Sequence, residues 1–171
     1  MPTFRQAISA DLPQIMDVVH QAQAFMAMLG IDQWQDGYPS AEIIAEDIRV
    51  GRAYVFDDGG SVASIAVLTA EPEPVYDAIE GAWHTGAPYL TIHRMAIGDA
   101  HRHTGLASEI LQNAVAMARE NGLAGVRADT HRGNRVMRRF LEKSGFSECG
   151  LVVYNTAAGD PLRVAYDLVI E

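Results

Sequence analysis

The sequence predicts an α/β fold in which a mixed sheet carries helices on both faces. Segments that alternate with period two, as strands do, are interleaved with amphipathic segments of helical period. Helices stand between strands in the middle of the chain and strands follow one another elsewhere, in the order β-α-α-β-β-β-α-β-α-β-β. The 171 residues give room for one domain with a substantial core, spanning 1–171.

The first part of the chain predicts a strand and two helices. Ser9 or Asp11 can cap the first helix and Ser40 the second, while Gly30 and Gly51 end them. Between the helices lies an aromatic loop that suits neither helix nor strand. In order, the elements are a strand at 3–8, a helix at 11–29, the loop at 31–39 and a helix at 41–50.

The rest of the chain predicts six strands and two helices. The connection at 71–88 is polar, contains proline and glycine, and holds at most one turn of helix; such long connections are often functional. Gly145 is expected to end the last helix in a left-handed conformation, and 155–161 has the composition of a hairpin turn. The strands are expected at 52–56, 61–68, 89–97, 125–130, 146–154 and 162–170, and the helices from the turn at 102–107 to 121 and at 134–143.

Composition excludes several classes of protein. The formal net charge of -9 argues against a general nucleic-acid binder and favours a cationic small substrate. The single cysteine, Cys149, excludes an internal disulfide and a multi-cysteine zinc site. No apolar run is long enough to span a membrane and no export signal is recognisable, so we expect a cytoplasmic protein.

The stretch 93–111 predicts an anion-binding turn. A strand ends near Ile97, and a tight turn at 102–107 opens a helix, whose first backbone N–H groups lack intrahelical partners. Gly105 and Ala107 would let a bulky anion approach the backbone, and Arg102 can form paired hydrogen bonds to phosphate oxygens. Taken alone, such a turn is also simply the start of a helix.

Four features together resemble the GCN5-related N-acetyltransferase (GNAT) superfamily over essentially the whole chain. They are the order of elements, the R-H-T-G-L-A run at 102–107, Asn134 after the next strand, and the N-R-V-M-R-R-F-L-E-K-S-G-F segment at 134–146. The resemblance implies a mixed, mostly antiparallel sheet of about six to seven strands, splayed in the middle. Within the superfamily, the chain more closely resembles bacterial members that carry a Q-W-x-x-G-Y-P loop and a D-T-H-x-x-N segment.

By that resemblance the ligand is acetyl-coenzyme A. Its pantetheine arm would pair with the open strand edge at Met95, Ala96 and Ile97, where one amide could stabilise the tetrahedral oxyanion. Asn134 would contact the arm, although an equally good interpretation makes it the N-cap of the last helix. The pyrophosphate would lie on the turn, on Arg102, His103, Thr104, Gly105, Leu106, Ala107 and Ser108.

Three residues on the splayed strands are candidates for the catalytic base. His93 shares a strand face with Met95, and imidazole titrates near neutrality; its alternative is a structural histidine. Asp129 could bind a substrate ammonium or pair with an arginine, Arg127 or Arg132. His131 shares the face of Asp129 and could equally cap the loop that follows. The residues leave the choice among the three open.

A tyrosine that many family members use to protonate the departing thiolate is replaced here by Leu141. Ser108, Tyr154 or water could substitute, and a thiolate is a tolerable leaving group unaided.

The leading hypothesis from the resemblance is an acetyl-CoA-dependent N-acetyltransferase acting on a primary amine of a small molecule or peptide, by direct attack in a ternary complex. The alternative is a catalytically inactive CoA-binding sensor or partner domain. A third hypothesis, transfer of a longer acyl group, depends on the pocket volume near the thioester. The resemblance also makes a homodimer an expectation.

The aromatic loop predicts the substrate site. Trp34 and Tyr38 could form an aromatic wall for an amine beside Asp36, or pack beneath the loop as a satellite core, and Tyr76 and Trp83 invite the same two interpretations. Cys149 is expected to be a buried small hydrophobe. No metal site is expected, because the histidines at 101–105 are too close together on the turn to converge on an ion.

Overall fold

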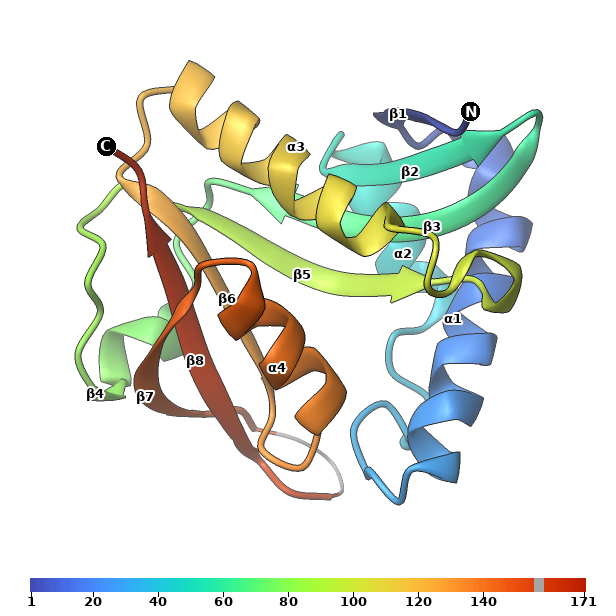
Figure 1. Cartoon of the computed structure of the whole chain (residues 1–171). Coiled ribbons are helices and arrows are strands. Elements are labelled where there is room, and N and C mark those ends of the chain that lie inside the picture. The colour runs from blue at the N-terminus through green and yellow to red at the C-terminus, as the bar shows by residue number, and fades with distance from the viewer. Residues whose placement is uncertain (156–158) are drawn as a thin grey trace.

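The computed structural model describes residues 1–155 and 159–171, which form an eight-stranded sheet with helices on both faces (Figure 1). The strand order is β1-β2-β3-β5-β6-β8-β7-β4, and every neighbouring pair is antiparallel except β5–β6. The strands are β1 (Thr3–Gln6), β2 (Ala53–Asp58), β3 (Ser61–Thr69), β4 (Glu80–Gly81), β5 (Leu90–Ile97), β6 (Gly125–His131), β7 (Ser147–Val153) and β8 (Leu162–Val169). The helices are α1 (Leu12–Met28), α2 (Ala41–Arg49), α3 (Leu106–Glu120) and α4 (Arg135–Lys143).

The predicted fold class is confirmed, with one more strand than the six to seven expected. The addition is β4, which pairs with β7 at the sheet edge through Glu80 and Gly81. The approach is so close that a Cβ atom on Gly81 would lie 2.2 Å from the Cys149 carbonyl oxygen, and one on Gly150 would lie 2.1 Å from that of Glu80. Two residues are too short to show a strand pattern, so sequence alone gave no sign of β4.

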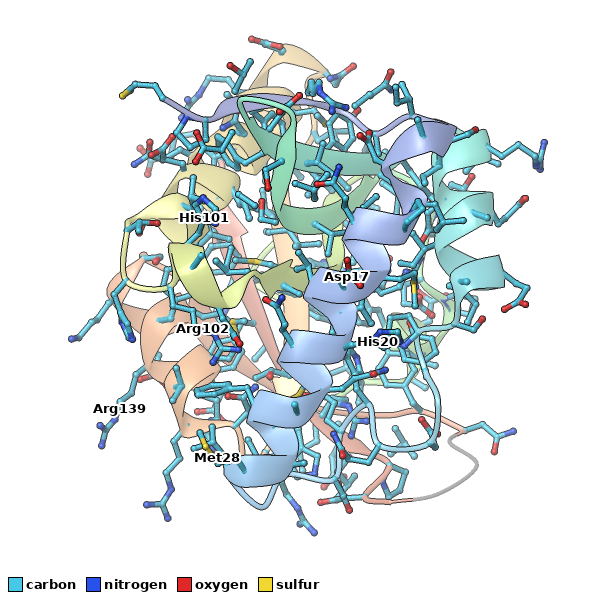
Figure 2. The ribbon with its side chains drawn as sticks, turned by 90° about the vertical axis from the view of Figure 1, so that its right-hand side faces the viewer. Asp17, His20, Met28, His101, Arg102 and Arg139 are labelled. Atoms are coloured by element: carbon cyan, nitrogen blue, oxygen red, sulfur yellow. The ribbon has the colours of Figure 1, made fainter. Side chains whose placement is uncertain are left out.

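Two apolar cores lie against the sheet, one on each face, and each is covered by a different pair of helices. Helices α1 and α2 cover one face of the N-terminal strands, where Ile15, Val19 and Ile44 are fully buried (Figure 2). Helices α3 and α4 cover the opposite face and pack Ile110 and Leu141 against the middle of the sheet. Helix α3 thus buries one apolar face, as expected for a segment of amphipathic helical period.

Local details agree with the predictions in part, and the clearest departure is in the first strand. The first strand ends at Gln6 rather than residue 8, because the Asp11 carboxylate accepts the Ile8 N–H and closes a 3-10 turn instead of capping α1. The connection at 71–88 holds its single helical turn at Pro74–Ala78. The expected hairpin turn at 155–161 includes residues 156–158, which lie outside the described residues, although β7 and β8 on either side do pair antiparallel. Gly145 has the expected positive φ, +92°.

In the described part of the chain, none of the helices has the length and apolar character needed to cross a membrane.

Candidate active site

The middle of the sheet opens between β5 and β6. These parallel strands pair at only two positions, Leu90 with Val126 and Thr91 with Arg127, and then diverge (Figure 1). On its other side β5 stays paired with β3 as far as Ile97. The predicted splay is thus present, and it leaves the β6-facing edge of residues 93–97 without a neighbouring strand.

A β-bulge bends β5 at the start of this opening. Arg94 and Met95 together oppose Ala66, and Arg94 has a left-handed φ of +48°, a conformation that costs a non-glycine residue about 1–2 kcal/mol. The Arg94 side chain holds the bulge through two hydrogen bonds to the buried carboxylate of Asp47, at 2.7 and 2.8 Å. Its third contact is a 2.8 Å bond to the hydroxyl of Tyr38.

The predicted anion turn leads from β5 into α3. Gly105 has φ +92°, which only glycine adopts freely, and no atom comes within 4 Å of a Cβ placed on it. The N–H of Glu109 makes the first helical bond, to the Gly105 carbonyl. The N–H groups of Leu106, Ala107 and Ser108 therefore precede the hydrogen-bonded helix and point toward its open end.

Arg102 does not extend freely from the turn. Its guanidinium lies 3.9 Å above the ring of Phe25 in α1 and 2.7 Å from a carboxylate oxygen of Asp99. Figure 2 shows Arg102 beside α1, with His101 on the adjoining turn. A phosphate would thus have to share this arginine with Asp99, and the backbone amides are the principal donors of the turn.

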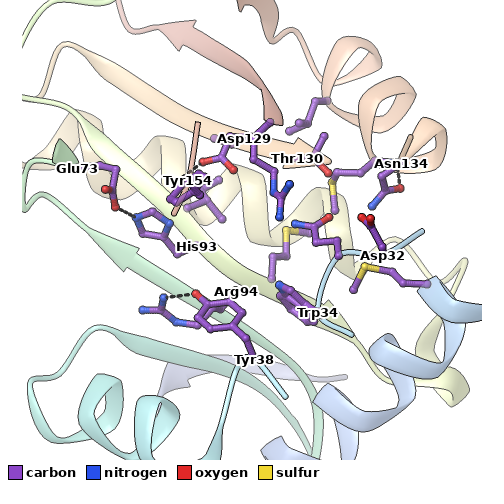
Figure 3. Close-up of a pocket in the computed structure, with 18 of the residues that line it drawn as sticks. Asp32, Trp34, Tyr38, Glu73, His93, Arg94, Asp129, Thr130, Asn134 and Tyr154 are labelled. Carbon is purple, nitrogen blue, oxygen red and sulfur yellow. Dashed lines mark hydrogen bonds and ion pairs between the residues drawn. The ribbon is translucent and has the colours of Figure 1, made fainter. Parts of the chain in front are cut away.

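A cavity of about 340 Å³ lies at the opening of the sheet. The loop after α1 contributes Trp34 and Tyr38, β5 contributes His93, and β6 contributes Asp129 (Figure 3). Several segments far apart in the sequence thus converge on one space, as expected for a small-molecule site.

His93 lies in this cavity and faces Glu73 from the 71–88 connection. Its Nε2 atom is 3.5 Å from a Glu73 carboxylate oxygen, and both side chains are largely buried (Figure 3). Burial, followed by the positive charge of Arg94, lowers the pKa of His93 to about 4, and the negative charge of Asp47 opposes this shift without reversing it. Burial also raises the pKa of Glu73. The imidazole is therefore uncharged near neutral pH and can accept a proton.

Asp129 makes contacts that the sequence did not predict. One of its oxygens, Oδ2, accepts hydrogen bonds from the hydroxyls of Tyr76 and Tyr154, each at 2.7 Å. Figure 3 shows Tyr154 beside Asp129. Burial raises the pKa of Asp129, whereas the two tyrosine hydrogen bonds lower it. Neither arginine considered from the sequence is its partner: Arg127 donates to Thr85, and Arg132 to Asp160.

The third candidate base, His131, lies outside the residues that line the cavity. Its Nδ1 accepts the N–H of Gly133 at 2.9 Å, and its Nε2 lies 2.6 Å from a carboxylate oxygen of Asp32. These contacts join the loop after β6 to the loop after α1. The arrangement favours the loop-capping interpretation of His131 over a role as base.

Trp34 and Asn134 each combine a structural role with a place at the cavity. Trp34 packs against the apolar layer under α1 and also lines the cavity, so both of its interpretations hold. Asn134 caps α4, since its Oδ1 accepts the Met137 N–H at 3.1 Å, while the residue also borders the cavity. Its amide group remains available for a ligand, and that contact stays a prediction.

The proposed substitutes for the missing tyrosine are poorly placed to protonate a thiolate. Leu141 itself is buried and borders the cavity. Burial and the charge of Asp129 raise the pKa of Tyr154 far above its ordinary range, and its proton is held by Asp129. Ser108 is exposed on the first turn of α3 and borders a separate surface groove.

Tertiary structure also brings together His84, Cys149 and Asp167, the single group with metal-ligand spacing among the described residues. No sequence motif predicts this group, because its three residues come from separate segments of the chain. The Asp167 carboxylate accepts the backbone N–H groups of His84 and Thr85, at 2.7 and 2.8 Å, and thereby fixes the connection at 71–88. Burial raises the pKa of Cys149 to about 12, which agrees with the expected buried, unreactive thiol.

Comparison with known proteins agrees with this geometry. The sequence profile described as "Acetyltransferase (GNAT) family" matches residues 18–146. A GNAT-family acetyltransferase from Streptococcus agalactiae has 38% identity and a TM-score of 0.86, with 99% of this chain and 96% of that chain covered. The comparison with curated proteins gives no match.

More distant structures share the fold. A GNAT-family acetyltransferase from Listeria monocytogenes has 17% identity and a TM-score of 0.74, with 99% of this chain and 95% of that chain covered. The ribosomal-protein-S18-alanine N-acetyltransferase of Escherichia coli has 17% identity and a TM-score of 0.69, with 99% and 94% covered. The matched profile and the 38% identity along the whole length show that this chain belongs to the GNAT acetyltransferase family.

Proposed function

We propose that the protein is an acetyl-CoA-dependent N-acetyltransferase that moves an acetyl group to a primary amine by direct attack in a ternary complex. The observation that carries the proposal is the uncharged, largely buried His93 beside Glu73, in a cavity at the opening between β5 and β6. A proton acceptor at that place is what the attack of an amine on a thioester requires.

The turn before α3 fits the phosphates of acetyl-CoA. The N–H groups of 106–108 precede the first helical bond, and the space beside Gly105 is open. Oriented amides at the positive end of a helix bind anions without a paired side-chain charge. From this turn the unpaired edge of β5 leads back to His93, and a pantetheine arm would follow that edge.

His93 and Glu73 have different roles in removing the proton of the amine. An alkylammonium has a pKa near 10, so a proton must leave before the nitrogen lone pair can attack. The imidazole of His93 accepts that proton as the N–C bond forms, and Glu73, 3.5 Å from Nε2, stabilises the resulting imidazolium. Because burial lowers the pKa of His93 to about 4 and raises that of Glu73 above its ordinary 4.5, the carboxylate has the greater affinity for a proton, and a proton taken up by His93 can pass on to Glu73.

The tetrahedral intermediate carries a negative oxygen that needs a donor. We expect the donor to be a backbone N–H on the open edge of β5 within residues 95–97, and removing such a donor typically slows acyl transfer about 10²- to 10³-fold. When the C–S bond breaks, the thiolate leaves and takes a proton from water. Leu141 at the cavity supplies no proton.

An inactive CoA-binding domain is the second candidate, and Leu141 is the observation that favours it. The two differ in one measurement: release of CoA thiol from acetyl-CoA in the presence of a panel of primary amines and peptides. Calorimetric titration of acetyl-CoA comes first, since micromolar binding is required by both candidates. Binding without thiol release for any acceptor would leave the inactive domain as the function.

The role of His93 is tested with His93→Gln and a matched control, His20→Gln, on the exposed face of α1 (Figure 2). Loss of a general base slows the reaction about 10²- to 10⁴-fold. We expect that loss in kcat for His93→Gln with acetyl-CoA affinity retained, and no change for His20→Gln. Equal rates in the two variants would refute the assigned base.

A further inference from the structure

Arg163 is a buried arginine at the cavity that nothing above has used. It is the second residue of β8, where it lies opposite His131 of β6 and Val152 of β7. Strands on both sides cover it, and only 8% of its surface is exposed. It nevertheless borders the cavity that contains His93.

The guanidinium of Arg163 forms no contact ion pair in the described residues, although its charge acts on Asp129 from a greater distance. Its Nη1 donates to the backbone carbonyls of Asp160 and Leu162, at 2.6 and 2.9 Å. No carboxylate oxygen of residues 1–155 and 159–171 lies within 4.0 Å of the guanidinium, and residues 156–158 are Thr, Ala and Ala, which carry no carboxylate. A buried cation is normally paired, so a charge at the cavity wall without a partner points to an anionic ligand group.

Arg94, the other arginine at the cavity, differs from Arg163 in having a carboxylate partner. It donates two hydrogen bonds to the buried Asp47 carboxylate. By comparison, the Nε and Nη2 groups of Arg163 donate to no atom of the described residues. The buried side-chain polar atom that lacks any partner in that part of the chain is Thr91 Oγ1, so these two groups are not sealed in the protein interior. With no acceptor for these groups in the part of the chain that the structure describes, a carboxylate is the ligand group that would take the paired hydrogen bonds of an arginine.

Asp129 presents the opposite charge on the same face of the sheet. Asp129 pairs with Ala165 and His131 with Arg163, so Asp129 and Arg163 are diagonal neighbours whose Cα atoms are expected about 7–8 Å apart. Both tyrosine hydroxyls bind Oδ2 of Asp129, and Oδ1 has no partner among the described residues. Arg163, which can bind an anionic group, and Asp129, which can bind a cationic group, are therefore neighbours at one cavity.

We propose that the acetyl acceptor is a small amino carboxylic acid, whose carboxylate binds Arg163 and whose amine lies between Asp129 and His93. The inference rests on the proposed N-acetyltransferase function and narrows its substrate class. In the reaction, the amine nitrogen forms a bond to the acetyl carbon, its proton passes to His93, and the C–S bond of the thioester breaks. The products are the N-acetyl amino acid and, after the thiolate takes up a proton, CoA.

The test compares each of the twenty amino acids with its own carboxamide and with a dipeptide that it begins, using acetyl-CoA and the full-length protein. Thiol release gives the rate, and mass spectrometry identifies the N-acetyl product. We expect at least one amino acid to exceed its carboxamide by about 30- to 1,000-fold in kcat/KM, the usual effect of leaving one buried charge without its partner.

Arg163→Gln should remove this preference by raising KM for the acid about 30-fold or more, while the carboxamide changes little. Arg163→Lys should restore part of the preference, because lysine keeps the charge without the paired geometry. Arg132→Gln is the matched control: this arginine is 58% exposed, is paired with Asp160, and is not among the residues that line the cavity. It should keep the wild-type preference.

The outcomes separate the two proposals. If carboxamides or dipeptides react as fast as the acids, or if amines react and no acid does, the amino acid inference is wrong and the acetyltransferase proposal stands. If a sample that binds acetyl-CoA acetylates nothing in the panel, the inference is also wrong. Failure to bind acetyl-CoA at all would instead refute the proposed function. Should Arg163→Gln fail to fold, the wild-type comparison of acid with carboxamide decides.

Discussion

The guanidinium of Arg94 is bound to both oxygens of Asp47, a carboxylate whose side chain has no exposed surface. This pair fixes the strained bulge of β5 to helix α2 and so determines where β5 turns away from β6. Arg52 donates to the same carboxylate at 2.7 Å, so one buried anion serves two arginines.

Replacing Asp47 by Asn should therefore destabilise the protein strongly. Removal of one partner from a buried ion pair typically costs about 3–5 kcal/mol, because the remaining charges stay buried. Urea unfolding measures the change. The neighbouring Glu46→Gln breaks an exposed pair with Arg49 on the same helix and should change stability little. Similar losses in both variants would show that Asp47 is not the anchor of the bulge.

The lowered pKa of His93 predicts a pH dependence of stability. The folded protein has a pKa of about 4 at this histidine against 6.5 for the free side chain, so between these values the unfolded chain binds more protons. The free energy of unfolding therefore falls as the pH drops from 6.5 to 4, by up to about 1.4 kcal/mol per pH unit from this group. His93→Gln should flatten this part of the curve, measured by urea unfolding at each pH, and His20→Gln should leave it unchanged. A wild-type curve identical to that of His93→Gln would contradict the shift.

Gly105→Glu should abolish binding of acetyl-CoA by a folded protein. The substitution places a carboxylate beside the amides expected to hold the pyrophosphate, and like charges repel there. Gly105→Gln is the matched control, since it shares the strain of a side chain at φ +92° and nearly the same shape without the charge. Calorimetric titration should show that the glutamine variant retains more affinity than the glutamate variant. Unchanged affinity in a folded Gly105→Glu protein would place the phosphates elsewhere.

Tyr154→Phe should affect stability more than turnover. It removes one of the two hydrogen bonds on Asp129, at a typical cost of about 1–3 kcal/mol for a buried polar group left unsatisfied. Because Asp129 holds the Tyr154 proton, kcat should fall by less than about ten-fold, far below the effect of losing a general acid. Tyr54→Phe, at a ring stacked on Phe4 in β1 and β2, is the control. A fall in kcat of a hundred-fold or more with a normal melting temperature would make Tyr154 the proton donor of the thiolate.

What the sequence determined by itself was the order of elements apart from β4, the turn at 102–107 and the left-handed cap at Gly145. Each depends on neighbours within a few residues: a glycine with positive φ, a helix start, and apolar residues at helical spacing. His93 and Asp129, which both line the cavity, could be named as candidates for the same local reason, because both lie on strands beside the expected opening.

Only the tertiary structure decided the partners of those residues. Glu73 meets His93 across 20 positions of the sequence, and Tyr76 meets Asp129 across 53. Strand alternation gives the face on which a side chain lies, yet the residue that reaches it from another segment depends on how the 71–88 connection folds back onto the sheet. The bulge at Arg94 and the buried charge of Arg163 were hidden for the same reason: burial and ion pairing arise from packing between distant segments, which no local pattern records.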